Sequence, residues 1–174
     1  MIMKAKLIVE GREFPIEIQD PELQKLLTPK KKTGYERVLN NSDTYYYQSD
    51  VCCIHSVRDI GDRMDDIRYD NANYYCDQEV ARNNARADKL MRQLRRFAVE
   101  NGGTPNVDDW ERGCVKDKCT IYYNYDANRL EVGYSQIQRY FGEVYFNDPQ
   151  QVKAAIETFH DELIWYFTEY KDSL

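Results

Sequence analysis

Cys53 and His55 are the residues of this chain whose types and spacing come nearest to a catalytic pair. They lie two positions apart in a predicted strand, so their side chains point to the same face. A thiol activated by an imidazole can act as a nucleophile, but it needs a hydrogen bond to that imidazole and a third group to orient the base. No catalytic signature surrounds the pair. Hydrolysis by this pair is therefore the least favoured hypothesis, and no catalytic residue is assigned.

A second group of chemistry-bearing side chains is the acidic stretch 58–73. Its spacing matches no calcium-binding loop, because it lacks the glycine and the terminal glutamate that the EF-hand requires. We interpret it as a surface loop, and no metal site is assigned. Spaced carboxylates can also bind the arginines and lysines that otherwise bind phosphates. Three of them are candidate partner-binding residues: Asp62, Asp65 and Asp66.

The segment from Asp77 to Asn101 is predicted to be a long amphipathic helix. Asp77 suits the N-cap position, and Gly102-Gly103 follows the expected end. At 100° per residue, one side is apolar and should face the core; it carries Val80, Ala87, Leu90, Met91, Leu94, Phe97 and Ala98. A neighbouring side carries a basic ridge, which consists of Arg82, Arg86, Lys89, Arg92 and Arg96. On a chain with a net charge of -6, this ridge is a candidate contact surface for a partner.

Aromatic residues are the third candidate for partner contact. The fifteen tyrosines occur partly in runs, such as Tyr45-Tyr46-Tyr47. In a strand such a run places rings on both faces, so some rings join the core and others form contact surface. Stacking on nucleic-acid bases is the alternative, although no RNA-binding motif is recognisable. Trp165 lies opposite the main apolar face of the last predicted helix, so we expect an exposed anchor for a partner unless another part of the chain covers it.

Composition and length favour a folded protein with one domain and an appendage. The 174 residues are rich in aromatics, and disordered chains are poor in them. No run of eighteen apolar residues and no signal-peptide pattern occurs, so we expect a soluble, cytoplasmic protein that does not contact a membrane. The five cysteines match neither a disulfide framework nor a zinc site, which predicts free thiols. No cofactor is expected.

Residues 1–29 are predicted to form a ββα appendage. The segment Lys4–Ile18 has the alternation of a β-hairpin that turns at Gly11-Arg12. Asp20 then suits an N-cap with Pro21 at the first helical position, and the short helix should end before Pro29. A polar joint of lysines follows, so the main domain is predicted to span residues 30–174.

The main domain is predicted to be α+β, with antiparallel β-hairpins packed against two long amphipathic helices. Strands are expected at residues 34–38, 44–48, 51–57, 119–125, 129–134 and 143–146. The last helix should begin after Asp148-Pro149. Its buried face should carry Val152, Ile156, Phe159, Leu163, Phe167 and Tyr170.

Two strand-to-helix junctions of the main domain are similar to each other. Tyr74-Tyr75-Cys76-Asp77 leads into the first long helix, and Tyr145-Phe146-Asn147-Asp148 leads into the last one. Each junction follows a hairpin and combines aromatic residues with a capping aspartate. The similarity indicates either an internal duplication or the ordinary use of aromatics and caps at such junctions.

Four short blocks of the sequence form a pattern: TGYERV at 33–38, NYY at 73–75, RRFA at 95–98 and EVYF at 143–146. Together with the tyrosine run at 45–47, they resemble small uncharacterised accessory proteins of bacteriophages and prophages. That family has no assigned catalytic residues, so none is carried over. The resemblance implies a phage-borne protein in the host cytoplasm, with host takeover or counter-defence as its work.

We therefore expect a non-enzymatic binding protein, an anti-CRISPR-like inhibitor that occupies a surface of a host defence protein or of its nucleoprotein complex. The alternative is a nucleic-acid-binding accessory protein that uses the basic ridge. The two differ in their response to salt, because binding to nucleic acid weakens steeply as salt rises.

Overall fold

The computed structural model describes residues 3–9, 12–27, 32–38, 43–111 and 116–172. The chain divides into two compact units, residues 1–33 and residues 34–174. The boundary predicted after residue 29 lies outside the described residues. The predicted α+β class is confirmed, because helices occur together with antiparallel two-stranded sheets.

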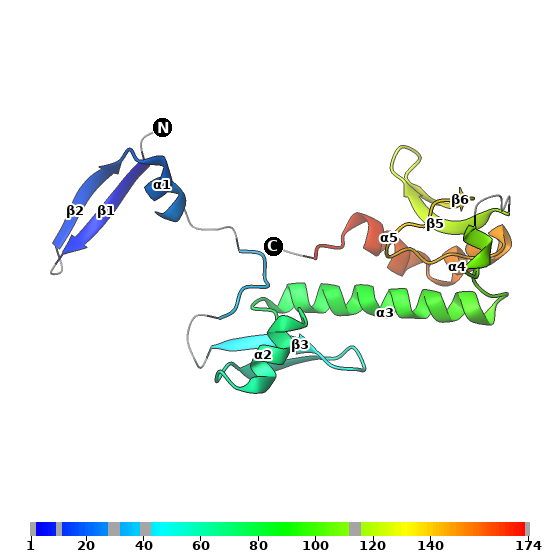
Figure 1. Ribbon diagram of the computed structural model, residues 1–174, viewed down its shortest axis with the longest axis horizontal. Helices are drawn as coiled ribbons and strands as arrows, with labels where there is room; N and C mark the ends of the chain where they lie inside the picture. Colours follow the sequence, from blue (N-terminus) through cyan, green and yellow to red (C-terminus); the bar gives the residue numbers. More distant parts are fainter. Residues whose placement is uncertain (1–2, 10–11, 28–31, 39–42, 112–115, 173–174) are drawn as a thin grey trace. The chain divides into compact units, whose positions relative to one another are not determined.

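The N-terminal unit is a β-hairpin followed by a short helix (Figure 1). β1 (Met3–Val9) pairs antiparallel with β2 (Arg12–Ile18). α1 (Pro21–Leu27) follows, and the Asp20 carboxylate accepts a hydrogen bond from the backbone N–H of Glu22 at 2.8 Å. The described residues therefore form the predicted ββα arrangement, with Asp20 as the cap of its helix.

The second unit is organised around one long helix, α3 (Gln78–Glu100) (Figure 1). The first lobe, residues 34–76, comprises β3 (Thr44–Gln48), β4 (Ile54–Arg58) and α2 (Arg63–Asp70). The second lobe, residues 104–172, comprises a short 3₁₀ turn (Asp108–Trp110), β5 (Lys118–Asn124), β6 (Arg129–Ser135), α4 (Pro149–Thr158) and α5 (His160–Thr168). α3 contacts elements of both lobes.

α3 begins and ends where the sequence predicts. The Asp77 side chain accepts hydrogen bonds from the backbone N–H groups of Glu79 at 2.8 Å and Val80 at 3.0 Å. All seven residues of the predicted apolar side are buried or half-buried, so the helical phase is confirmed. Ala81 is also buried and packs with Val80 in the core of the first lobe. α3 thus buries apolar surface against each lobe.

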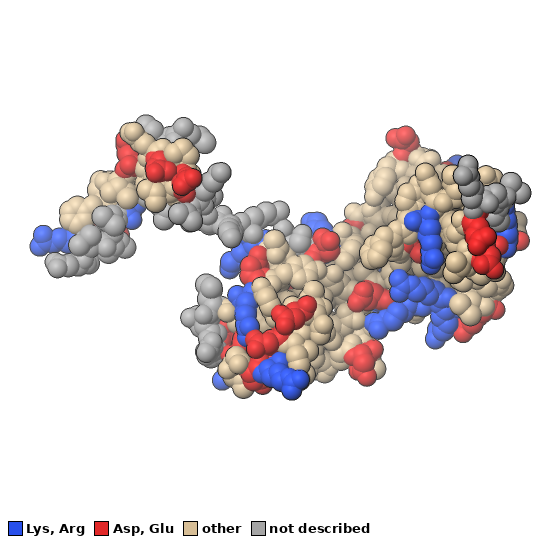
Figure 2. Space-filling view, viewed as in Figure 1, with Lys and Arg blue, Asp and Glu red and all other residues tan. Residues whose placement is uncertain are grey.

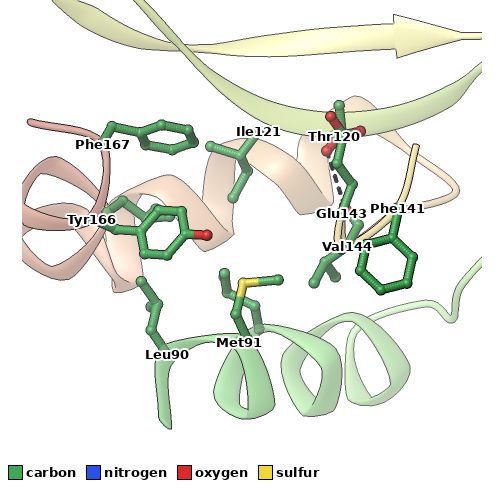
Figure 3. Close-up of a pocket in the computed structure, with 12 residues that line it drawn as sticks. Leu90, Met91, Thr120, Ile121, Phe141, Glu143, Val144, Tyr166 and Phe167 are labelled. Carbon is green, nitrogen blue, oxygen red and sulfur yellow. Dashed lines mark hydrogen bonds between the residues drawn. The ribbon is translucent and has the colours of Figure 1, made fainter. Parts of the chain in front are cut away.

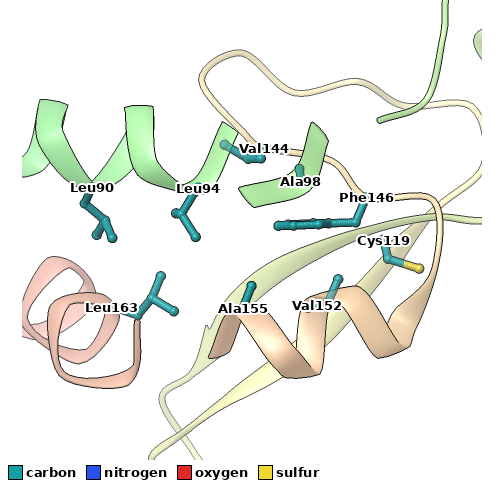
Figure 4. Close-up of a cluster of buried hydrophobic side chains, with 9 residues drawn as sticks. All are labelled: Leu90, Leu94, Ala98, Cys119, Val144, Phe146, Val152, Ala155 and Leu163. Atoms are coloured by element: carbon teal, nitrogen blue, oxygen red, sulfur yellow. The ribbon is translucent and has the colours of Figure 1, made fainter. Parts of the chain in front are cut away.

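The larger core lies in the second lobe, between α3, α4, α5 and β5 (Figure 4). Its buried members are Leu90, Leu94, Ala98, Cys119, Val144, Phe146, Val152, Ala155 and Leu163. The Asp148 side chain caps α4 by accepting a hydrogen bond from the backbone N–H of Gln150, with Pro149 at the first helical position as predicted.

The two hairpins of this unit meet their following helices in the same way. Tyr75 forms an isolated antiparallel bridge with Tyr46 of β3, and Phe146 forms one with Cys119 of β5. In both cases the bridging aromatic residue stands two positions before the aspartate that caps the helix. The two similar sequence junctions therefore build the same arrangement twice, and the strand predicted at 143–146 is reduced to this bridge.

Some predicted elements differ from the structure. Residues 34–38 form no strand, and residues 51–53 belong to the turn before β4. The last predicted helix is broken at Phe159, whose φ of -114° and ψ of 21° are not helical. The Phe159 ring packs edge-on against Phe97 of α3 at a centroid distance of 5.7 Å. All six residues of the predicted buried face are buried or half-buried despite the break. Trp165 is buried as well, with 8% of its surface exposed, so the predicted exposure of this ring is wrong.

The acidic stretch 58–73 is not a surface loop, because it contains α2. The Asp62 carboxylate caps this helix by accepting hydrogen bonds from the backbone N–H groups of Met64 at 2.7 Å and Asp65 at 2.9 Å. Asp65 is buried, as is Asp59 just before the helix. Asp65 therefore cannot offer its carboxylate to a partner as predicted.

The buried carboxylates are held by side chains from the other elements of the first lobe. Asp59 accepts hydrogen bonds from Arg37 Nε at 3.0 Å and from the Tyr74 hydroxyl at 2.8 Å. Arg37 also donates to Asp66 at 2.6 Å, so this predicted partner-binding residue already has an intramolecular partner. The Tyr45 hydroxyl donates to Asp65 at 2.7 Å. Buried carboxylates are costly unless they are hydrogen-bonded, and these contacts provide the compensation.

The same contacts set the ionisation of the two carboxyl groups. The Arg37 guanidinium lowers the pKa of Asp59, against the opposing effect of burial. Burial tends to raise the pKa of Asp65, but hydrogen bonds from Tyr45 and from the backbone of Ile60 and Asp62 together lower it. Both groups are therefore charged in the folded protein at neutral pH.

We predict that Leu94→Ala and Leu163→Ala each lower the free energy of unfolding by about 2–5 kcal/mol, because each leaves a cavity in the larger core. Only 4% and 2% of these side chains are exposed. Urea denaturation provides the measurement. Val99→Ala on the exposed side of α3 is the control and should cost less than about 0.5 kcal/mol. Losses that small at both leucines would contradict the placement of α3 and α5.

We predict that Asp59→Asn lowers the free energy of unfolding at pH 7 by about 1.5–3 kcal/mol, because Arg37 and Tyr74 lose a charged acceptor. The folded-state pKa of Asp59 lies below that of the unfolded chain, so its contribution is present above the ordinary carboxyl range and is lost as pH falls below about 4. Urea midpoints at pH 7 and pH 3 should show the difference between the proteins shrinking in acid. An equal difference at both pH values, or an equal effect of Asp70→Asn at an exposed position, would contradict this role.

Candidate functional site

An apolar pocket of about 230 Å³ opens in the second lobe (Figure 3). Three elements and one loop segment, distant in sequence, meet there: α3, β5, α5 and residues 141–144. The pocket is lined by Leu90, Met91, Leu94, Thr120, Ile121, Phe141, Gly142, Glu143, Val144, Leu163, Tyr166 and Phe167. It lies directly beside the larger core, which shares four of these residues.

Packing and hydrogen bonds hold the walls of the pocket in place. The Phe167 ring stacks on Tyr123 at a centroid distance of 6.1 Å, and the Tyr166 ring stacks on Tyr170 at 5.3 Å. Across the pocket, the Thr120 hydroxyl donates to the Val144 carbonyl oxygen at 3.1 Å, shown as the dashed line in Figure 3. The pocket is therefore formed by the fold itself and needs no rearrangement to exist.

The loop between β6 and α4 places an exposed aromatic ring at the edge of the pocket. The backbone N–H of Tyr140 donates to the Tyr145 hydroxyl at 2.9 Å, and Ser135 hydrogen-bonds to Gln138, so both ends of the loop are tethered. Gly142 has a φ of 85°, a conformation that glycine adopts without strain. The preceding residue, Phe141, is fully exposed. A fully exposed phenylalanine beside an apolar pocket is unusual for a surface without a partner.

Further apolar side chains are exposed in this loop and near the end of β6, which precedes it. We call the four exposed residues the apolar rim: Tyr134, Ile137, Tyr140 and Phe141. Their exposed fractions range from 54% to 107%. Aromatic rings of this kind are enriched at protein–protein interfaces, where they bury a large area at a low entropy cost. Pocket and rim together form the strongest candidate functional site of the described residues.

Few ionisable groups line this site. Glu143 is exposed on the lining, and the Tyr166 hydroxyl is directed into the pocket (Figure 3). Behind the lining, burial raises the pKa of Tyr145, and the neighbouring Glu143 carboxylate raises it further. The lining therefore offers recognition by shape and by a few polar atoms, and it contains no pair of nucleophile and base.

Comparisons with known protein families, curated proteins and solved structures found no match for this chain. Within the described ranges, no helix is both long and apolar enough to cross a membrane. Those residues also contain no cluster of three or more His, Cys, Asp or Glu side chains that could hold a metal ion. Cys52, Cys53, Cys76 and Cys119 are free thiols as predicted, whereas Cys114 lies outside the described residues.

The basic ridge is exposed on α3, and a basic patch is visible over the C-terminal half of this helix in Figure 2. Its members differ in what they contact. Arg86 donates twice to the Glu162 carboxylate, at 2.7 and 3.1 Å, and Arg96 lies 3.8 Å from Glu100. No hydrogen bond or ion pair with another described residue engages Arg82 or Lys89. The ridge is thus partly a structural feature and partly a free basic surface.

Arg86 also explains the burial of Trp165. Its guanidinium lies 3.9 Å from the centre of the indole ring, and the Tyr170 ring packs at 5.5 Å. α3 and the C-terminal residues therefore cover Trp165. A buried ring cannot serve as the exposed partner anchor that we predicted.

Arg92 contacts the turn of the first lobe. It donates to Cys52 Sγ and, in the amide orientation that satisfies both partners, to Gln48 at 3.0 Å. The nearby candidate pair is not assembled for catalysis, because no hydrogen bond joins Cys53 to His55, whose ring stacks on Tyr47 at 5.4 Å. Lys89, Arg92, Gln93 and Arg96 line a shallow hollow of about 270 Å³.

The pocket and the apolar rim were not predicted from the sequence. The sequence signal was a group of apolar residues at 134, 137, 140 and 141, which have the spacing of a helix face although residues 136–143 form no helix. Such a group in a loop marks surface contact more often than core.

We predict that the triple variant Arg82→Glu, Lys89→Glu and Arg96→Glu unfolds like the parent, within about 0.5 kcal/mol per site, because these residues lie on solvent. Arg86→Glu should instead lower the free energy of unfolding by about 1 kcal/mol, since it sets a carboxylate against Glu162 and removes the cation from Trp165. Urea denaturation and tryptophan fluorescence measure both effects. Equal losses for Arg86→Glu and Lys89→Glu would contradict this division of the ridge.

Proposed function

We propose that this protein is a non-enzymatic binding protein that docks on a partner protein through the pocket and the apolar rim. The observation that carries the proposal is the fully exposed Phe141 ring beside a preformed apolar pocket. An exposed ring and a pocket for a partner's side chain are the elements from which interface hot spots are built. Burying such a rim against a partner removes apolar area from water, which favours association.

The chemistry of the site also favours binding over catalysis. The hydroxyl of Thr120 is already hydrogen-bonded to Val144. The ionisable groups of the lining are the Glu143 carboxylate and the Tyr166 phenol. These groups can orient a bound side chain by hydrogen bonds, but they do not form a relay that would activate a nucleophile.

The partner that we propose is a bacterial defence protein, or its nucleoprotein complex, such as a CRISPR nuclease. This part of the proposal rests on the resemblance of the TGYERV, NYY, RRFA and EVYF blocks to phage accessory proteins. In that setting the protein acts in the cytoplasm of the bacterial host and inhibits its target by occupying a surface. Its net charge of -6 suits a target whose own surface binds nucleic acid and is therefore basic.

A second candidate function is nucleic-acid binding by the basic ridge. It is favoured by Arg82 and Lys89, which are exposed without a partner among the described residues, and by the basic hollow beside Lys89. Neutralising phosphates by such residues would make affinity fall steeply with salt.

We predict that the photo-crosslinking residue p-benzoylphenylalanine captures a discrete partner when it replaces Phe141, but not when it replaces Tyr69. Tyr69 is an exposed aromatic residue on α2 and serves as the matched control. The experiment uses the full chain in bacterial cells that carry a CRISPR system, with mass spectrometry of the crosslinked species. A defence protein captured at position 141 alone supports the proposal, whereas equal capture at both positions, or at neither, contradicts it.

The two candidate functions are separated by a binding assay with a duplex oligonucleotide at several salt concentrations. Under the proposed function, no salt-dependent affinity is expected, and the triple reversal at Arg82, Lys89 and Arg96 leaves crosslinking at position 141 unchanged. Affinity that falls with salt and disappears in the triple variant would favour the nucleic-acid alternative.

A further inference from the structure

We infer that the pocket accepts one aromatic side chain that carries a hydrogen-bonding atom, a tyrosine or tryptophan, from a partner segment in which the next residue is basic. This inference rests on the proposed function and specifies the chemistry of its partner. It draws on the volume of the pocket, the polarity of its interior and the charge at its edge.

The volume fits a single ring. At about 230 Å³, the pocket is larger than the cavity of about 150 Å³ that accommodates benzene. It is smaller than the roughly 300–1,000 Å³ of typical small-molecule sites. The pocket therefore suits one side chain of a protein more closely than a cofactor or a drug-sized ligand.

The walls favour an aromatic ring over an aliphatic chain. Tyr166 and Phe167 contribute rings, and Phe141 adds a third one at the edge (Figure 3). Met91 presents its thioether to the interior. Ring edges and methionine sulfur both make favourable contacts with an aromatic guest beyond simple burial of area.

The Tyr166 hydroxyl favours an inserted aromatic ring that carries a polar atom. Figure 3 shows this hydroxyl directed into the pocket. No described residue forms a hydrogen bond with it. A tyrosine hydroxyl or a tryptophan N–H from a partner can satisfy it, whereas phenylalanine or leucine would leave it unpaired on binding.

The charge at the edge of the pocket indicates a basic residue beside the inserted ring. Of the twelve described residues that line the pocket, Glu143 is the one with a formal charge, and it is exposed. A lysine or arginine next to the inserted ring can pair with this carboxylate, and an acidic residue would be repelled. This charge complementarity also agrees with the basic surface expected of a nucleic-acid-handling target.

The test uses the full chain with ¹³C-labelled methionine methyl groups and blocked tripeptides as probes. Met91 reports on the pocket, and Met64, which is exposed on α2, is the internal control. N-acetyl-Gly-Tyr-Lys-amide should shift the Met91 methyl signal but not the Met64 signal, with a dissociation constant in the millimolar range typical of such small ligands. The Leu-Lys and Tyr-Glu peptides should bind several-fold more weakly.

Two variants test the named contacts. Tyr166→Phe keeps the ring and should weaken the Tyr-Lys peptide about fivefold, as expected for one hydrogen bond. The Phe-Lys peptide should not be weakened and should bind the variant somewhat more tightly than the parent, because no hydroxyl is then left unpaired. Glu143→Gln should remove the preference for lysine over glutamate. Thermal melting of both variants verifies that they fold.

The inference is overturned if no peptide moves the Met91 signal, or if the Leu-Lys peptide binds as tightly as the Tyr-Lys peptide. It is likewise overturned if both variants behave as the parent does. These outcomes are distinguishable from failure of the proposed function, because crosslinking at position 141 tests partner docking without reference to the side chain that enters the pocket.

Discussion

The second unit depends on one helix that must bury apolar residues against both lobes. α3 presents Val80 and Ala81 to the first lobe and Leu90, Leu94 and Ala98 to the second. A two-stranded hairpin is marginally stable by itself, so neither lobe has a sheet large enough to stand alone. The remaining arc of α3 must face solvent, and the four arginines and one lysine of the basic ridge lie on it.

The cores of the two lobes are built from different types of side chain. The second lobe uses aliphatic residues and phenylalanine, as ordinary cores do. The first lobe uses tyrosines, of which Tyr45 and Tyr74 stack with ring centroids 3.9 Å apart. The hydroxyls of these two tyrosines need partners, and the carboxylates of Asp65 and Asp59 supply them. Two carboxylates of the acidic stretch are thus part of the core, and these two are unavailable to a partner.

Much of the fold follows from local sequence rules, and the wrong or missing predictions have a common cause. The caps at Asp20, Asp77 and Asp148 and the apolar periodicity of α3 depend on neighbouring residues, and all were predictable. The burial of Asp65 depends on Tyr45, which is twenty positions away, and no local pattern reveals it.

The same limit applies to the break at Phe159 and to the candidate site. No glycine or proline marks the break, which accompanies packing on Phe97 of α3. The pocket is built from segments of α3, β5, α5 and the loop before α4, so it exists only in three dimensions. Sequence reasoning located candidate contact residues on single elements and could not combine elements into a site.

The apolar rim has a consequence for colloidal behaviour. In the unbound protein, Ile137 and Phe141 lie in water, where they favour adhesion between copies of the chain. At neutral pH the net charge of -6 opposes this adhesion by repulsion. Near the isoelectric point of about 5.0 that repulsion vanishes while the rings remain exposed. Acidity and high salt are thus the conditions in which we expect the free protein to precipitate, and the partner proposed above would keep it in solution by covering the rim.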